Sequence, residues 1–170
     1  MKAGKWDGIK GLEEWRTIPS DMGQIYEISR NARLENILLA EAAGVSIAMN
    51  MKRTGFRPTQ EEEIEALESA LTELINNAIK YGAKNITIDW HPKRETLPVT
   101  DDGNGIRDTE AIWLKGVREA GAGSEGEGLG LWAVKERFTK LGWKIEAAST
   151  PGTGSTFTIT PKEGAIQYQK

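Results

Sequence analysis

Four short motifs occur in a fixed order along this chain of 170 residues, and they constrain its fold more than any other feature. One is a polar stretch inside an apolar helical pattern, one is an Asp-Gly turn, and two are rich in glycine. They occupy residues 73–81, 101–106, 126–131 and 152–155. Helix edges, turns and glycine linkers are each common, so no single motif indicates a function. Their combined order and spacing indicate one ligand pocket to which all four contribute.

Length and composition exclude several classes of protein. The length suits one domain that can bury a core without disulfides, and the chain has no cysteine. A net charge of -3 argues against a general nucleic-acid binder, which needs a surplus of lysine and arginine. Residues 1–19 lack the apolar core of a signal peptide, and no stretch approaches the roughly 20 apolar residues of a membrane span. We therefore expect a cytoplasmic protein without nucleic-acid or membrane partners.

Two long stretches have helical periodicity. Apolar residues recur every three or four positions over residues 29–52, which predicts a helix with a break near Gly44. A second helix is expected over residues 59–81, where acidic residues 61–63 occupy the first turn and Gly82 ends the helix.

Strand patterns follow the second helix. Residues 85–90 alternate between polar and apolar and predict a half-buried strand, paired with a strand that ends at Thr100. Pro98 has no N–H for a β-ladder, so it either falls at a bulge or the strand is short. Further elements are expected at 129–141 (helix), 143–149 and 155–160 (strands). The pattern predicts an α+β fold, a two-layer sandwich with helices on one face of a mixed, mostly antiparallel sheet.

Three polar residues of the second predicted helix share one side. Glu73, Asn77 and Lys80 are separated by four and three positions, so their side chains point together. They form either a solvated helix edge or a binding site. The Asn77 oxygen suits Mg²⁺, and Lys80 can neutralise a phosphate. Asn76 is adjacent and offers the same group.

Asp101 ends a predicted strand and precedes two glycines, Gly103 and Gly105. An ionised carboxylate accepts hydrogen bonds but cannot donate them, so it suits the exocyclic amine of adenine and repels the carbonyl of guanine. The chemistry favours ATP over GTP. An ordinary Asp-Gly turn is the alternative.

Gly126, Gly128 and Gly130 lead directly into a predicted helix. Such a loop exposes backbone amides and the positive end of the helix dipole to an anion such as a triphosphate. A flexible linker is the alternative, and both interpretations hold if residues 107–127 form a mobile lid. The spacing matches neither a Walker loop nor a Rossmann loop.

Together the motifs resemble the Bergerat-type, or GHKL, ATPases, which include DNA gyrase, Hsp90, MutL, sensor histidine kinases and anti-sigma-factor serine kinases. The resemblance covers roughly the last hundred residues closely and the preceding fifty loosely. It implies that Asn77 holds Mg²⁺, that Glu73 is a catalytic general base, and that Asp101 rather than Asp102 binds adenine. The other ATP-binding residues it implies are Lys80, Gly103, Gly105, Ile106, Gly126, Gly128, Leu129, Gly130, Leu131 and Ser155, with Thr156 as a substitute for Ser155.

The kinase branches of that class fit best. The chain ends soon after Ser155, without the second domain of gyrase, MutL and Hsp90, and its region from Ile25, read as a strand and a helix, is similar to the anti-sigma serine kinases. We expect an arm at 1–20, one domain at 21–162 and a polar tail at 163–170. The expected function is an ATP-dependent protein kinase of bacterial signalling that phosphorylates a partner protein. A nucleotide-gated module that sequesters a regulator, and a plain ATPase, stay open, as does homodimerisation.

Overall fold

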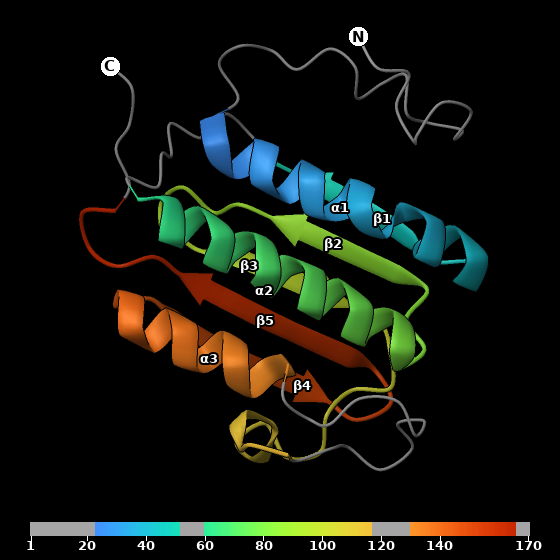
Figure 1. Ribbon diagram of the computed structural model, residues 1–170. Coiled ribbons are helices and arrows are strands. Elements are labelled where there is room, and N and C mark those ends of the chain that lie inside the picture. The colour runs from blue at the N-terminus through green and yellow to red at the C-terminus, as the bar shows by residue number, and fades with distance from the viewer. Residues whose placement is uncertain (1–22, 52–59, 117–129, 166–170) are drawn as a thin grey trace, which may run out of the picture.

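Helices cover one face of a five-stranded sheet in this protein (Figure 1). The structure is a computed structural model, and it describes residues 23–51, 60–116 and 130–165. The helices are α1 (Gly23–Ala43), α2 (Glu61–Lys80) and α3 (Gly130–Leu141), with a 3-10 helix η2 (Ala111–Trp113). The strands are β1 (Ser46–Asn50), β2 (Asn85–Asp89), β3 (Leu97–Asp101), β4 (Lys144–Thr150) and β5 (Gly154–Thr160).

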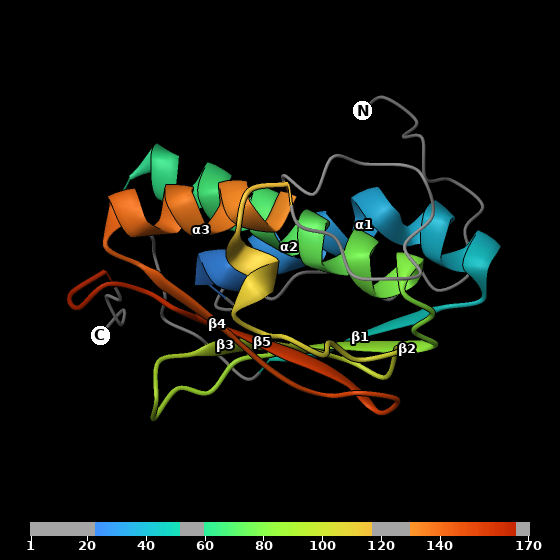
Figure 2. The ribbon, with the colours of Figure 1, turned by 90° about the horizontal axis from the view of Figure 1, so that it is seen from below.

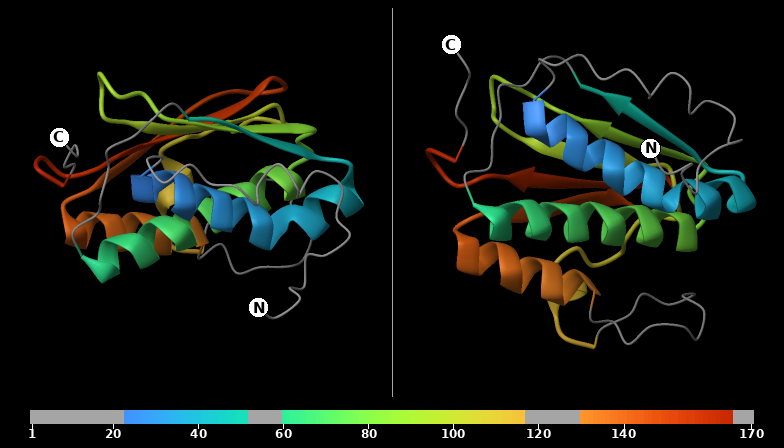
Figure 3. Two further views of the ribbon diagram at one scale, coloured as in Figure 1. Left: turned by 90° about the horizontal axis from the view of Figure 1, so that it is seen from above. Right: turned by 45° about the horizontal axis from the view of Figure 1, so that its top comes forward.

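The two layers are plain in a view along the sheet (Figure 2), where the described helices all lie on the same side. Helix α2 lies between α1 and α3 (Figure 3). The strand order is β1-β2-β3-β5-β4. Only the β1–β2 pair is parallel among these neighbours, and the other three pairs are antiparallel. The predicted α+β sandwich with a mixed, mostly antiparallel sheet is therefore confirmed.

The expectation of one broken helix over residues 29–52 is wrong in its second half. Helix α1 ends at Ala43, Gly44 adopts a φ of 68°, and residues 46–50 then form strand β1. The order of a strand followed by a helix, inferred from Ile25 onward, is also reversed. The five residues 46–50 are too few to distinguish the helical period from the strand period. Pairing with β2 makes them a strand.

Strand β3 is short, which explains how it accommodates Pro98. Its register with β2 runs only from Val99 to Asp101, whereas Pro98 lies opposite Thr158 of β5. Pro98 is thus outside the part of β3 that is paired on both sides.

His91 is exposed in the β2–β3 connection, as expected for a loop residue. No helix in residues 23–51, 60–116 or 130–165 has the length and apolarity needed to span a membrane.

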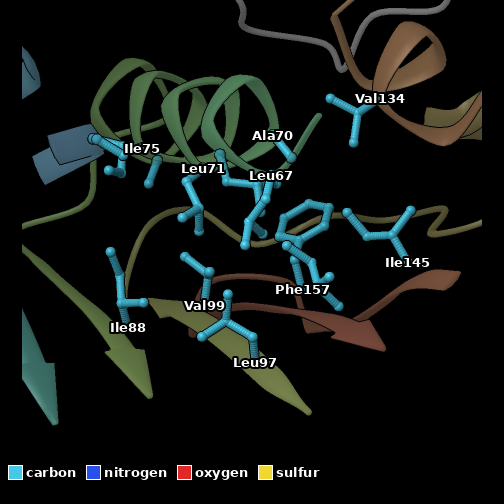
Figure 4. Packing of buried hydrophobic residues seen from close by; sticks show 14 of the residues in the cluster. Leu67, Ala70, Leu71, Ile75, Ile88, Leu97, Val99, Val134, Ile145 and Phe157 are labelled. Atoms are coloured by element: carbon cyan, nitrogen blue, oxygen red, sulfur yellow. The ribbon is translucent and has the colours of Figure 1, made fainter. Parts of the chain in front are cut away.

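The core lies between α2 and the middle of the sheet (Figure 4). Leu67, Leu71 and Ile75 of α2 are fully buried and face Val99 of β3 and Phe157 of β5. Fully burying a side chain of this size contributes about 1.5 to 3 kcal/mol. This packing fixes α2 over β3 and β5, and it therefore sets where the polar residues of α2 lie.

The predicted acidic first turn of α2 is present, and one of its three glutamates is buried. The Glu63 side chain is fully buried, and its Oε1 lies 3.0 Å from Lys162 Nζ. The indole N–H of Trp143 donates to the same oxygen at 3.3 Å. The carboxylate therefore joins α2 to the segment that follows β5, and burial without these partners would be strongly unfavourable.

Residues 107–116, the first part of the expected loop, are partly packed against the core. They include η2, which buries Ile112 and Trp113. The rest of the expected lid, residues 117–127, lies outside the described residues, as do Gly126, Gly128, Leu129 and the expected N-terminal arm at 1–20.

Candidate functional site

Helix α2 presents Glu73 and Asn77 on the side that borders α3. Both are half-buried, while Lys80, one turn further on, is exposed. Gly130, the first residue of α3, lies directly against Glu73, because a β-carbon at position 130 would overlap the Glu73 carboxylate. The structure thus brings together the first motif and the last glycine of the third.

Asp101 and Ser155 lie opposite each other where β3 and β5 pair. Side chains two positions apart in a strand point to the same face. Asp101 therefore points to the inner face with Val99, and Ser155 points to it with Phe157. The backbone N–H of Gly103 donates to Asp101 Oδ1 at 2.8 Å. Burial raises the pKa of Asp101 above its ordinary value, and the Gly103 bond partly offsets this effect. Asp101 is therefore a half-buried acceptor at the end of the sheet.

Asp102 has a structural role instead. Its Oδ1 accepts the backbone N–H groups of Lys84 and Asn85 at 2.7 and 2.8 Å. Its Oδ2 accepts the Asn85 side-chain amide at 2.8 Å. Hydrogen bonding to Asn85 and to the Lys84 amide lowers the pKa of Asp102 to about 2. The choice of Asp101 over Asp102 as the ligand-facing carboxylate agrees with this geometry.

The two glycines after Asp101 are required by close packing. Gly103 is buried, and a β-carbon there would lie 2.9 Å from Asp101 Oδ1 and 3.0 Å from the Tyr81 carbonyl oxygen. Gly105 adopts a φ of 73°, and a β-carbon would overlap the Thr150 carbonyl. The second motif is therefore packed between the end of α2 and the β4–β5 turn.

Ser149 completes this arrangement, and sequence reasoning missed it. Its hydroxyl accepts the backbone N–H of Ile106 at 2.7 Å and lies 2.8 Å from the Gly154 carbonyl. It also lies 2.9 Å from the Ser155 hydroxyl. Ser149 thus connects the second motif to the fourth. A serine in an alternating strand gives no sequence signal for this contact.

The structure does not bring Thr156 to this site. Neighbouring residues of a strand point to opposite faces, so Thr156 lies on the outer face when Ser155 lies on the inner one. Its hydroxyl is 3.1 Å from that of Thr100 on the same outer face. Thr156 is therefore no substitute for Ser155.

Ile106 and Leu131 are half-buried, and both pack against the core at the border of the site.

Within the described residues, no group of three or more His, Cys, Asp or Glu side chains is placed to hold a metal ion. Mg²⁺ in phosphate sites commonly takes only one or two protein oxygens together with water and phosphate oxygens. Asn77 and Glu73, one helical turn apart on α2, supply suitable oxygens.

Comparisons with known proteins agree with this fold and set of motifs. Residues 62–165 match the model of the family described as histidine kinase-, DNA gyrase B-, and HSP90-like ATPase. Sensor histidine kinase YcbM of Bacillus subtilis (strain 168) is 28% identical over 166 residues, which cover 92% of this chain and 53% of YcbM. Sensor-like histidine kinase SenX3 of Mycobacterium tuberculosis (strain ATCC 25618 / H37Rv) is 34% identical over 102 residues, 55% of this chain and 25% of SenX3.

Solved structures show the same fold. The mycobacterial sensor histidine kinase MprB superposes with a TM-score of 0.62 at 20% identity, over 79% of this chain and 91% of the MprB chain. Full-length ShkA in complex with AMPPNP gives a TM-score of 0.68 at 21% identity, over 86% of this chain and 31% of ShkA. The fold and motifs define a GHKL-type ATP-binding domain, and the chain belongs to the histidine kinase-, DNA gyrase B- and HSP90-like ATPase family. It spans about half the length of YcbM and a quarter of SenX3.

Proposed function

We propose that this chain is the ATP- and magnesium-binding kinase module of a bacterial signalling protein, and that it transfers the γ-phosphate of ATP to a partner protein. The observation that carries this proposal is the convergence of the motifs. Asp101 lies beside Ser155 at the end of the sheet, Gly103 packs against Tyr81 at the end of α2, and Glu73 of α2 contacts α3. Adenine and phosphate recognition thus have candidate residues on adjoining elements.

Each residue has a proposed role that follows from its place. Asp101 accepts the adenine amine, and Gly103 and Gly105 let the backbone that follows Asp101 pack closely enough to hold its carboxylate in place. Ser155 adds a hydroxyl beside Asp101, held by Ser149. Ile106 and Leu131 border the base or the phosphates with apolar surface.

The phosphate end is assigned to α2 and to the start of α3. Lys80 neutralises phosphate charge, and the Asn77 oxygen holds the magnesium ion, which screens the charge of the phosphates when bound. The amides at the start of α3, from Gly130 onward, face the anion. Gly126, Gly128 and Leu129 remain predicted contributors from the sequence pattern alone.

Glu73 is the proposed general base. In the transfer, the bond between the γ-phosphorus and its bridging oxygen breaks, a bond from the acceptor nitrogen or oxygen forms, and ADP leaves. The acceptor loses a proton, which the Glu73 carboxylate is positioned to take beside α3.

Incubation with γ-labelled ATP and a cell lysate tests the phosphotransfer. A labelled protein band that resists base but not acid indicates a phosphorylated histidine, which the relation to sensor histidine kinases favours. A band that resists acid indicates serine instead. Release of labelled phosphate without any labelled protein would support a plain ATPase and contradict the transfer.

The contact between Glu73 and Gly130 gives a prediction. In the Gly130→Ala variant the new β-carbon displaces the Glu73 carboxylate, while the fold is retained because alanine favours a helix over glycine. General bases contribute about 10² to 10⁴ in rate, so we expect turnover to fall roughly tenfold or more with a smaller change in ATP affinity. Single-turnover phosphorylation and calorimetric titration measure the two effects.

Glu73→Gln serves as the reference for that experiment. If Gly130→Ala acts through Glu73, it should have little further effect on turnover in the Glu73→Gln background. Full turnover by Gly130→Ala, or equal losses in both backgrounds, would contradict the assigned role.

A further inference from the structure

Two crossed pairs of lysine and tryptophan connect the segment 113–115, at the end of η2 and just after it, to the first turns of α3. Lys115 Nζ lies 4.9 Å from the centroid of the Trp132 ring, and Lys135 Nζ lies 4.8 Å from the centroid of the Trp113 ring. Each segment supplies one cation and one aromatic ring, and η2 lies beside α3 (Figure 1). Both distances are within the range of attractive cation–π contacts. We call these four residues the Lys–Trp clasp.

The clasp continues to the sheet. Trp113 is buried and makes an edge contact with Phe157, with ring centroids 5.9 Å apart and an interplanar angle of 89°. Phe157 follows Ser155 by two residues on β5 and lies opposite Val99 of β3. Trp113 therefore contacts both Lys135 of α3 and Phe157 of β5, and so connects α3 to the strand that carries Ser155.

Helix α3 is also held by Val134 and Phe138, which are buried in the core, and by an ion pair with α2. Arg137 Nη2 lies 3.0 Å from Glu65 Oε2 of α2, and Arg137 Nη1 lies 3.4 Å from Ser69 Oγ. Both partners are exposed, so this ion pair is a weak restraint. The first turn of α3 is closer to the clasp, since Trp132 is only two residues after Gly130.

We propose that the Lys–Trp clasp positions the first turn of α3 and thereby sets the affinity for the triphosphate, separately from the affinity for adenine. This inference rests on the proposed function, in which the amides at the start of α3 meet the phosphates and Asp101 meets the base. Amide and dipole interactions with an anion fall off within one helical turn, so a small displacement of Gly130 weakens them. Asp101 and Ser155 belong to the sheet and stay in place when α3 shifts. The four clasp residues are positioning residues.

The exposed pair of the clasp is the better one to test, because Trp113 is buried and its loss would damage the core. Lys115 is exposed and Trp132 is half-buried. Lys115→Met and Trp132→Leu should each weaken Mg-ATP binding about two- to fivefold, the equivalent of an exposed cation–π contact. Both variants should bind adenosine as the unaltered chain does. Lys115→Arg and Trp132→Phe keep a cation and a ring, and they should retain most of the ATP affinity.

Two controls separate positioning from other effects. Lys140→Met removes the same charge from the exposed last turn of α3 and should leave ATP affinity unchanged. The double variant Lys115→Met/Trp132→Leu should bind ATP no more weakly than either single variant, because each single change already removes the contact. Thermal unfolding of every variant confirms that the fold is retained.

The outcomes are distinct. Equal losses for ATP and adenosine, or unchanged ATP affinity in Trp132→Leu, would overturn the inference and leave the proposed function standing. If the unaltered chain shows no Mg-dependent binding of ATP, both the proposed function and this inference fail.

Discussion

Replacing Asn77 with alanine is expected to abolish magnesium-dependent binding of ATP while the fold survives. Asn77 is half-buried on the side of α2 that borders α3, one helical turn after Glu73. Loss of its oxygen removes the assigned protein ligand of the metal ion, and a triphosphate without its metal is poorly neutralised. Alanine favours the helix, so the free energy of unfolding should not fall. Calorimetric titration with ATP, in magnesium and then in EDTA, measures the effect.

Asn76→Ala is the matched control for that variant. It removes the same carboxamide one position along the helix, about 100° around its axis, so it should retain magnesium-dependent binding. If Asn76→Ala loses that binding and Asn77→Ala keeps it, Asn76 is the ligand, and the assignment of α2 side chains is incorrect.

The second large effect is expected at Asp101. Asp101→Asn replaces a charged acceptor with a neutral amide and should weaken ATP binding by about 1.5 to 3 kcal/mol, or about ten to a hundred and fifty fold. Discrimination against GTP should narrow as well, because the new amide can donate to the guanine carbonyl. Because burial raises the pKa of Asp101, ATP affinity should begin to fall on acidification at a higher pH than an ordinary aspartate would give.

Asp102→Asn provides the comparison, since it makes the same chemical change at the adjacent residue. It should reduce the free energy of unfolding and leave ATP affinity nearly unchanged, because Asp102 binds the amides of Lys84 and Asn85. The folded pKa of Asp102 is lowered to about 2, so its stabilisation is present above the unfolded value of about 3.9 and is lost as pH falls through about 2. A larger loss of ATP affinity in Asp102→Asn than in Asp101→Asn would reverse the two assignments.

Sequence patterns predicted the elements whose periodicity extends over many residues. The second helix was predicted over 59–81 and is observed at Glu61–Lys80, and strands β2, β4 and β5 lie within one or two residues of their predicted bounds. Strand β1 was missed, because five residues after a helix have no period of their own and depend on pairing with β2.

In the candidate site too, the sequence predicted what local geometry determines and missed what long-range contacts determine. Helix geometry was enough to predict that Glu73 and Asn77 share one side of α2, and the grouping of Asp101 with them in one ATP site stays a prediction. The contacts of Ser149, Glu63 and Trp113 depend on residues far away in the sequence. Glu63 is the last of three consecutive glutamates at 61–63, and only the packing of Trp143 and Lys162 distinguishes it from Glu61 and Glu62.

Calorimetric titration of the unaltered chain with ATP and GTP, each with magnesium and with EDTA, tests the central claim most directly. The account predicts that ATP binds in the presence of magnesium, that EDTA weakens this binding strongly, and that GTP binds at least roughly tenfold more weakly, as expected for one charged acceptor at Asp101. Equal affinities for ATP and GTP, or ATP binding that is the same in EDTA as in magnesium, would contradict it.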